Sequence, residues 1–272
     1  CVIRNEMEDL LGTSYVTCMI RGANLLFAGN RSGTVGVWSV TEDAEGCVEV
    51  GDVLCEWDVA ASLPLAMQRA ILALDIAVDE RGTEKRLMCM TACGLVCISN
   101  TIDLSAGLCG MSLGEEDSLT FSAAAHSRSS NPSDEALFVT AFFSHDHLVT
   151  VVTRDEVLRY TWDGVKVGTY MAASFSSVNG RIAFACKHDR ALRNDEDVGC
   201  SSKKNPRTAS LVVASSNGVV RMIDAESGGH AIIGTAEVEQ DVLGGASVIR
   251  GAMSCGTLAL ADDAGRVHIV HL

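Results

Sequence analysis

The chain has 272 residues, a formal net charge of −14 and a mean hydropathy of +0.22. With 47% hydrophobic residues, the chain is too hydrophobic to be intrinsically disordered. No apolar run reaches the roughly 18 residues of a membrane-spanning helix. With 35 acidic against 21 basic side chains, we expect no direct binding to nucleic acid and none to an anionic membrane.

The most regular pattern is a pair of apolar runs joined by a tight turn. The first pair spans residues 25–38 and turns at Gly33, where glycine supplies the positive φ that hairpin turns require. The third pair has Arg154 and Asp155 where its glycine turn would stand. The later pairs span residues 87–98, 148–160, 211–224 and 258–271. This recurrence predicts five β-hairpins.

Each hairpin is flanked by further strand-like runs. Upstream runs lie at Tyr15–Ile20, Ile71–Val78, Leu137–Phe143, Arg181–Cys186 and Val248–Met253. Weaker downstream runs lie at Val48–Trp57, Ser118–Ala125, Val165–Met171 and His230–Val238. Five units of three or four strands at a long repeat are typical of a β-propeller, here one domain over residues 1–272. We expect Val2–Met7 to supply the missing strand of the last unit and close the ring.

The hairpins resemble those of the WD40 family, in which a glycine turn is followed by a strand ending in Trp-Asp. Trp38 occupies the family's tryptophan place, although Ser39 follows it, and Ala125-His126 stands for the family's Gly-His. The turns recur at longer intervals than the roughly 40–45 residues of the family, which predicts long loops. The resemblance implies an all-β, WD40-like propeller with five recognisable four-stranded blades. Two questions stay open: whether the ring has five or seven blades, and whether the chain is a fragment of a larger ring.

A second resemblance concerns two short motifs. Residues 28–33 (Ala-Gly-Asn-x-x-Gly) and 147–164 (His-Leu-Val…Trp-x-Gly) are similar to the propeller subunit of the mRNA-export THO complex. Both resemblances imply a non-catalytic protein–protein interaction scaffold that forms one subunit of a larger complex, with other proteins as its partners.

The 11 cysteines do not read as a disulfide framework. Cys18, Cys89, Cys97 and Cys186 lie inside apolar runs, where free cysteine behaves as a small hydrophobe. The count is odd and the first residues lack a secretory leader, so we expect reduced thiols in the cytoplasm or nucleus. Because the chain begins with Cys rather than Met, we also expect an N-terminal part to precede it.

Two groups of residues suggest a metal site without completing one. The run Cys89-x3-Cys93-x3-Cys97 has wider spacing than structural zinc pairs and no second pair follows it. His145 and His147 form a His-x-His between two apolar runs, where a polar turn is the more economical interpretation. We therefore expect no metal, no cofactor and no catalytic residues.

The alternative hypothesis is a propeller hydrolase that resembles the WD40-type diphthine-methylester esterase. It requires His145 or His147 to act as a general base within reach of a substrate proton and a neighbouring nucleophile. No motif of a serine hydrolase, a phosphate-binding loop or a zinc protease supports it. We therefore expect the chain not to be an enzyme.

Two polar segments read as insertions: residues 127–135 as a surface loop and residues 188–207 as a mobile loop. A connection between the first and second strands of a blade emerges opposite the glycine turns. The His-x-His turn and the longer insertion would then share one face, which we predict to be the docking face. The predicted docking residues are His145, Asp146, His147, His188, Asp189, Arg190, Lys203 and Lys204.

Overall fold

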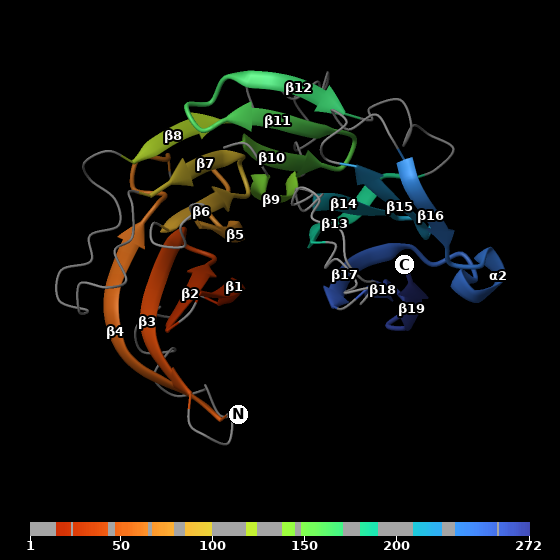
Figure 1. Cartoon of the computed structure of the whole chain (residues 1–272), viewed down its shortest axis with the longest axis horizontal. Coiled ribbons are helices and arrows are strands. Elements are labelled where there is room, and N and C mark those ends of the chain that lie inside the picture. Colours follow the sequence, from red (N-terminus) through yellow and green to blue (C-terminus); the bar gives the residue numbers. More distant parts are fainter. Residues whose placement is uncertain are drawn as a thin grey trace, which may run out of the picture. The chain divides into compact units, whose positions relative to one another are not determined.

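The computed structural model describes residues 15–22, 24–42, 47–64, 67–78, 85–99, 118–123, 138–144, 148–170, 180–189, 209–224, 232–254 and 256–272. Their strands form five antiparallel sheets that follow one another along the chain (Figure 1). We call these sheets blades 1 to 5. Within each sheet, each strand pairs with its neighbour in sequence, which makes every sheet an antiparallel meander.

Blade 1 contains β1 (Val16–Gly22), β2 (Leu25–Asn30), β3 (Thr34–Glu42) and β4 (Val48–Asp58). Blade 2 contains β5 (Ile71–Val78), β6 (Lys85–Thr91), β7 (Leu95–Ile98) and β8 (Leu119–Ser122). Blade 3 contains β9 (Phe138–Ser144), β10 (Leu148–Thr153), β11 (Val157–Thr161) and β12 (Lys166–Tyr170). Every predicted strand of these blades is confirmed.

Blade 4 contains β13 (Ile182–Asp189), β14 (Ala209–Ser215), β15 (Val219–Asp224) and β16 (Ile232–Glu237). A one-turn helix, α2 (Gln240–Leu243), leads to blade 5. Blade 5 contains β17 (Val248–Ser254), β18 (Thr257–Asp262) and β19 (Val267–His271). The segment predicted to complete it, Val2–Met7, lies outside the described residues. Among those residues, no helix has the length and hydropathy to span a membrane.

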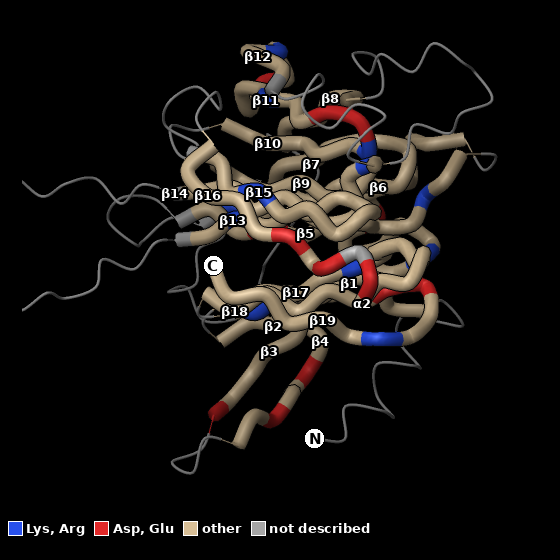
Figure 2. Tube along the Cα trace, turned by 90° about the vertical axis from the view of Figure 1, so that its right-hand side faces the viewer, with Lys and Arg blue, Asp and Glu red and all other residues tan. Residues whose placement is uncertain are grey.

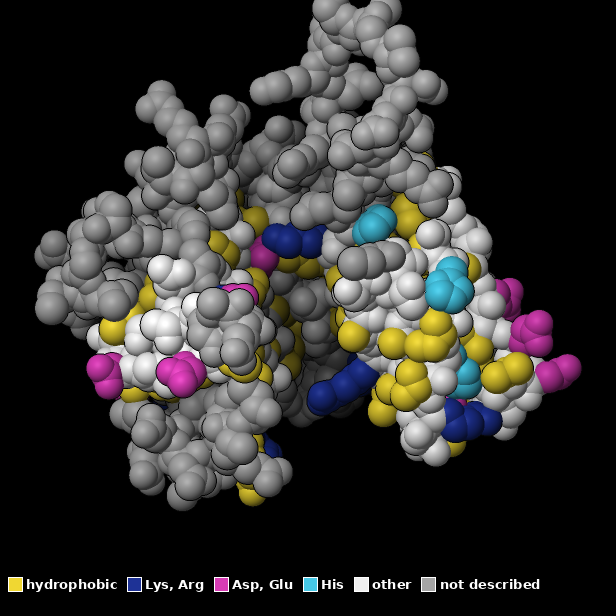
Figure 3. All heavy atoms as spheres, turned by 60° about the horizontal axis from the view of Figure 1, so that its bottom comes forward, with side chains coloured by type: hydrophobic (Ala, Val, Ile, Leu, Met, Phe, Trp, Pro, Cys, Tyr) yellow, Lys and Arg dark blue, Asp and Glu magenta, His cyan; other side chains and the backbone are white. Residues whose placement is uncertain are grey.

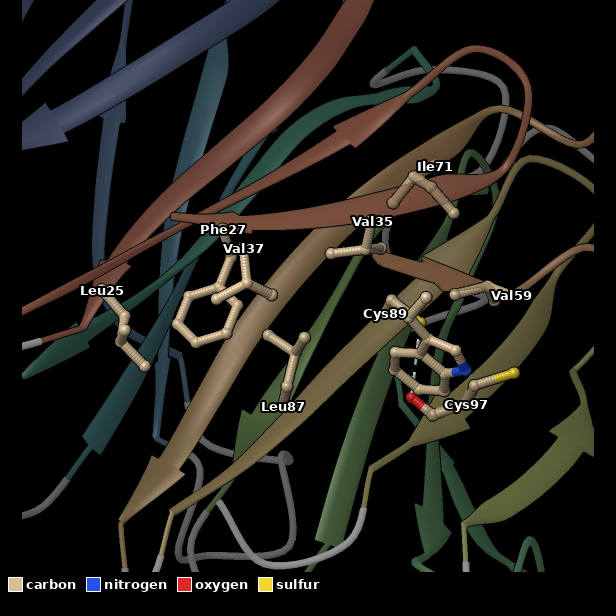
Figure 4. Close-up of a cluster of buried hydrophobic side chains, with 10 residues drawn as sticks. Leu25, Phe27, Val35, Val37, Val59, Ile71, Leu87, Cys89 and Cys97 are labelled. Atoms are coloured by element: carbon tan, nitrogen blue, oxygen red, sulfur yellow. Dashed lines mark hydrogen bonds between the residues drawn. The ribbon is translucent and has the colours of Figure 1, made fainter. Parts of the chain in front are cut away.

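The chain divides into two compact units, one with blades 1 and 2 and the other with blades 4 and 5, while the strands of blade 3 are shared between them. In the first unit, blades 1 and 2 pack face to face. Phe27 and Val37 of blade 1 meet Leu87 and Cys89 of blade 2 in a buried apolar cluster (Figure 4). In the second unit, Val212 of blade 4 lies in a like cluster with side chains of blade 5.

A buried polar side chain ends the second strand of every blade. In blade 1 this residue is Asn30, whose Oδ1 accepts hydrogen bonds from the N–H groups of Gly33 (3.0 Å) and Thr34 (2.9 Å) and from the Ser32 hydroxyl (2.8 Å). The side chain thus holds the hairpin turn as a capped loop. The residues at this position are Asn30, Thr91, Thr153, Ser215 and Asp262, and all are buried.

The same arrangement recurs with different chemistry in the other turns. The Thr153 hydroxyl accepts from the N–H of Asp155 and of Glu156, and it donates to the carbonyl of Glu156. The Ser215 hydroxyl donates to the carbonyl of Val219 across its turn. The turn end of each blade is therefore rigid, because its backbone groups are bonded to buried side chains.

Candidate interaction surfaces

The predicted docking residues fall mostly outside the described part of the chain. His188 and Asp189 are described, and the structure places them in β13 rather than in the insertion. The ladder continues through both, with His188 opposite Ser210 and Asp189 opposite Ala209, so the polar segment begins later than predicted. The others, His145, Asp146, His147, Arg190, Lys203 and Lys204, lie outside the described residues, as does the predicted loop at residues 127–135.

The strand order places the two kinds of connection at opposite ends of each blade. In blade 4, the turn at Asn217 joins β14 to β15, whereas the connection from Asp189 to Ala209 joins β13 to β14. Antiparallel neighbours reverse direction at each connection, so these two lie at opposite ends of the sheet. The connection that contains His147 likewise joins the first two strands of blade 3. We call this the loop end and the other the turn end.

The loop end carries the longest connections within the blades, whereas the turn end carries the connections between blades. At the loop end, residues 79–84, 99–118 and 190–208 connect successive strands of blades 2 and 4. At the turn end, the second-to-third-strand turns are short, as between Asn30 and Thr34, and residues 59–70 and 123–137 lead from one blade to the next. Binding residues are concentrated on loops that a rigid frame supports. The length of the connections within the blades therefore favours the loop end for recognition.

The turn end of blade 5 is held by a network centred on Asp262. Its Oδ1 accepts from the N–H groups of Ala264 (3.0 Å) and Arg266 (2.9 Å). Its Oδ2 lies 2.8 Å from Nε of Arg266 and 2.9 Å from Nε2 of His268. Burial acts to raise the pKa of Asp262, but the hydrogen bonds from Arg266 and His268 outweigh it and lower that pKa below its ordinary value.

Arg266 extends this network to the neighbouring helix. Its guanidinium donates to the carbonyl groups of Val242 and Leu243, the last residues of α2. A cation at a helix C-terminus satisfies carbonyl groups that have no partner within the helix. Asp262 and His268 therefore have a structural role, because the hydrogen bonds of Asp262 to His268, Arg266 and the turn backbone hold the turn between β18 and β19.

The outermost strand of blade 1 is strongly acidic. Glu49, Asp52, Glu56 and Asp58 are exposed along β4, and Figure 2 shows acidic residues along β3 and β4. Charged side chains on an edge strand discourage pairing with another chain. This edge is therefore protected against strand addition, and it presents negative charge to any partner that approaches it.

Blade 5 has exposed apolar side chains on one face of its sheet. Cross-strand partners share a face, and the pairings place Ala252, Ala259 and Ile269 in one row, with Ala261 and Val267 in the next. Val267 is 65% exposed and Ile269 is 57% exposed. The right-hand part of Figure 3 shows hydrophobic side chains gathered on this blade. We call this surface, which also carries Arg250 and His271, the open face.

Two of the three cysteines that suggested a metal site lie in ordinary strand positions, and Cys93 lies in the turn between β6 and β7. Cys89 and Cys97 are directly opposite each other on β6 and β7, both buried and both free thiols. Burial is the main cause that raises the pKa of the Cys89 thiol well above its ordinary value. A protonated thiol is a poor metal ligand. Among the described residues, no group of three His, Cys, Asp or Glu side chains could hold a metal ion.

Sequence comparison gives no relative: no protein-family model matches the chain, and no curated protein matches it. Solved structures do match. One is BBS1N in complex with ARL6DN, with a TM-score of 0.57, 15% identity and coverage of 96% of this chain and 66% of that one. Another is the β-propeller domain of Cps50 (Swd1) from Myceliophteria thermophila, with a TM-score of 0.52, 13% identity and coverage of 95% and 68%.

The fold is a five-bladed β-propeller. The five sheets described above form the blades, and the matched domain of Cps50 (Swd1) is likewise a β-propeller. The chain spans about two thirds of the length of these structures. At identities this low the likeness establishes the fold alone, and the function has to be argued from the chain's own surfaces.

Proposed function

We propose that this chain is a non-catalytic protein–protein interaction scaffold, a WD40-like subunit of a larger assembly. The observation that carries the proposal is the difference between the two ends of the blades. Buried side chains hold the turns at one end, whereas the longest connections within the blades, residues 99–118 and 190–208, leave from the other. A rigid frame that presents long loops suits recognition of other proteins.

The comparisons support the same role. BBS1N was solved in a complex with another protein, ARL6DN, and its fold resembles that of this chain. The WD40 and THO resemblances of the sequence point to an assembly subunit, although no family model supports either one. The net charge of −14 favours protein partners over nucleic acid or an anionic membrane.

We place the scaffold in the cytoplasm or nucleus. The odd number of cysteines, 11, supports a reducing compartment, because thiols are kept reduced there. Imaging of the tagged protein in its source cells tests this, and accumulation in the secretory pathway would contradict it. The hydrolase hypothesis depends on His145 and His147, which lie outside the described residues, and no described feature favours it.

The docking proposal assigns binding to the loop end, through the eight predicted residues from His145 to Lys204. The tagged, intact chain is isolated under mild conditions, and its partners are quantified by mass spectrometry. Two variants test the loop end: one replaces residues 190–207 by a short Gly-Ser linker, and the other replaces His145 and His147 by alanine. Each is expected to lower the amount of the stoichiometric partner recovered with the chain at least about tenfold. An intact chain that purifies without partners would contradict the scaffold function.

The matched controls lie at the turn end. Arg31 and Arg154 are exposed turn residues there, and their replacement by alanine is expected to leave the bound partners unchanged. If these two variants remove the partner and the loop-end variants retain it, the docking face has been assigned to the wrong end of the blades.

A further inference from the structure

Three described side chains meet at the loop end, where blade 2 contacts blade 3. Arg86 is the second residue of β6 and follows the connection of residues 79–84, whereas Trp162 directly follows β11. Phe143 is the next-to-last residue of β9, just before the connection to β10. All three residues belong to the first compact unit, so their contacts lie within that unit.

A buried carboxylate holds this group from below. Asp75 of β5 is buried, and its Oδ2 accepts a hydrogen bond of 2.8 Å from the N–H of Phe143. The ring of Phe143 lies 5.5 Å from the ring of Trp162 at an interplanar angle of 59°, a tilted arrangement that aromatic pairs favour. Because Phe143 is also buried, the indole of Trp162 rests on a buried base.

The guanidinium of Arg86 lies over this indole. Its Cζ is 5.3 Å from the ring centroid of Trp162, within the roughly 6 Å reach of a cation–π contact. The carboxylate of Asp75, on the same face of blade 2, is bonded to Phe143 rather than to Arg86. In the described part of the chain, Arg86 forms no ion pair and no hydrogen bond. Its charge is therefore positioned but not neutralised.

The stacked geometry decides what Arg86 can bind. Stacking occupies one face of the guanidinium, and the N–H groups lie in its plane, so they point away from the ring. A carboxylate accepts two such N–H groups side by side, and these bidentate pairs are among the strong hydrogen bonds of proteins. Stacking also restricts the side chain before binding, so ordering it costs less. Arg and Trp are, in addition, enriched at the centres of protein interfaces.

Charge favours a carboxylate over other anions. The net charge of −14 disfavours nucleic acid and anionic membranes, which require many cations, but one carboxylate requires only one guanidinium. At physiological ionic strength, exposed charges more than about 8 Å from the site are largely screened. Arg86 supplies one positive charge, which matches one carboxylate, whereas a phosphate group carries about −1.5 to −2 at pH 7.

From these contacts we propose that the stacked pair of Arg86 and Trp162 is a recognition site for a carboxylate side chain, Asp or Glu, in an acidic segment of a partner protein. Arg86 binds the carboxylate, and Trp162, Phe143 and Asp75 position Arg86. The inference rests on the proposed scaffold function, because it names the chemistry of the segment that the loop end binds.

The test is a titration of the purified whole chain with acetylated, amidated hexaglutamate, followed by NMR of the indole N–H groups. The signal of Trp162, assigned with Trp162→Phe, is expected to shift and saturate with a dissociation constant of about 0.1–10 mM. The signals of the buried Trp38 and Trp57 are expected to stay in place, and hexaglutamine is expected to shift none of the three. Absence of a shift with hexaglutamate, or an equal shift with hexaglutamine, overturns the proposal.

Three variants identify the group that binds. Arg86→Gln removes the charge and is expected to raise the dissociation constant at least about tenfold. Arg86→Lys keeps the charge but loses the planar fork, and it is expected to raise the constant about threefold to fivefold. Arg31→Gln, at an exposed residue of the turn end, is the matched control and is expected to change nothing. Circular dichroism and unfolding midpoints establish that all variants fold. Wild-type affinity of Arg86→Gln overturns the proposal, as does inorganic phosphate that binds more tightly than hexaglutamate.

Isolation of the tagged chain separates this inference from the scaffold function. Arg86→Gln is expected to lower the amount of recovered partner at least about tenfold, and Arg31→Gln is expected to leave it unchanged. A partner that Arg86→Gln retains in full overturns the carboxylate site and leaves the scaffold function standing. A wild-type chain without partners contradicts the scaffold function, and the hexaglutamate titration then decides the carboxylate site by itself.

Discussion

Replacement of Asn30 by alanine tests whether the buried side chains at the turn end hold the blades together. Asn30 is 1% exposed, and its Oδ1 is the acceptor for the N–H groups of Gly33 and Thr34. Each buried donor left without an acceptor costs about 1–3 kcal/mol. Asn30→Ala is therefore expected to lower the free energy of unfolding by about 2–6 kcal/mol, a large share of the roughly 5–15 kcal/mol that stabilises a domain.

The assay is equilibrium unfolding in urea followed by tryptophan fluorescence. Asn30→Thr is the matched variant, because Thr153 fills this position in blade 3 and its hydroxyl accepts from two backbone N–H groups of its turn. It is expected to cost less than Asn30→Ala, because it keeps an uncharged oxygen acceptor at this position. Arg31→Ala, at an exposed residue of the same turn, is expected to change nothing measurable. Equal losses for the alanine and threonine variants of Asn30 would refute the reasoning.

Three further predictions concern backbone, pH and thiol reactivity. Gly94→Ala is expected to lower the free energy of unfolding in urea by more than about 2 kcal/mol, because φ at Gly94 is +81° and an added Cβ would lie 2.3 Å from the ring of Phe138. Gly265 is the control: its φ is also +81°, but no atom lies near an added Cβ, so Gly265→Ala is expected to lower the free energy of unfolding by about 1 kcal/mol. Because folding lowers the pKa of Asp262, its ionised carboxylate stabilises the folded chain at pH values above the ordinary Asp pKa, and this stabilisation is lost as the pH falls below that value. The difference in unfolding midpoint between wild type and Asp262→Asn is therefore expected to become smaller from pH 7 to pH 3. A difference that stays constant would contradict this. Burial raises the pKa of Cys186 to about 12, so mass spectrometry after alkylation at pH 8 is expected to find it far less modified than the exposed Cys47, and equal rates would count against its burial.

Much of the fold was predictable because strand residues repeat with a simple chemistry. The runs around Gly33, Gly94 and Gly218 alternate apolar residues on either side of a glycine, and each glycine has positive φ in the structure. A two-residue period and a turn glycine depend only on local sterics, so they are visible in the sequence alone. Five blades, rather than seven, follow from the five sheets of the described residues.

The capping residues could not be predicted from sequence in the same way. Asn30, Thr91, Thr153, Ser215 and Asp262 share a position and a function, but they share no side chain. What unites them is a buried side-chain oxygen at the end of the second strand that can hydrogen-bond groups of the following turn, which becomes apparent only when strand ends are known. Hydrogen bonds to backbone groups tolerate several acceptors, so such a site leaves little sequence signal.

The strand position of His188 and the open face were missed for a related reason. A polar segment after Cys186 favoured a loop, but backbone pairing with β14 carries the strand through His188. Val267 and Ile269 read as ordinary strand residues, because alternation cannot tell which face of a sheet is covered. Val35 and Val37 hold the corresponding positions of β3 in blade 1 and are buried, and only this comparison reveals the difference.

The most direct test of the scaffold function is hydrogen–deuterium exchange on the intact chain, isolated with its bound partners and compared with the chain alone. We expect slower exchange in the complex at the loop end, over residues 145–147 and 190–208, and unchanged exchange at the turns of residues 31–33 and 216–218. Slower exchange at those turns alone, or no bound partner to compare, would contradict the proposal that this propeller binds proteins through its long loops.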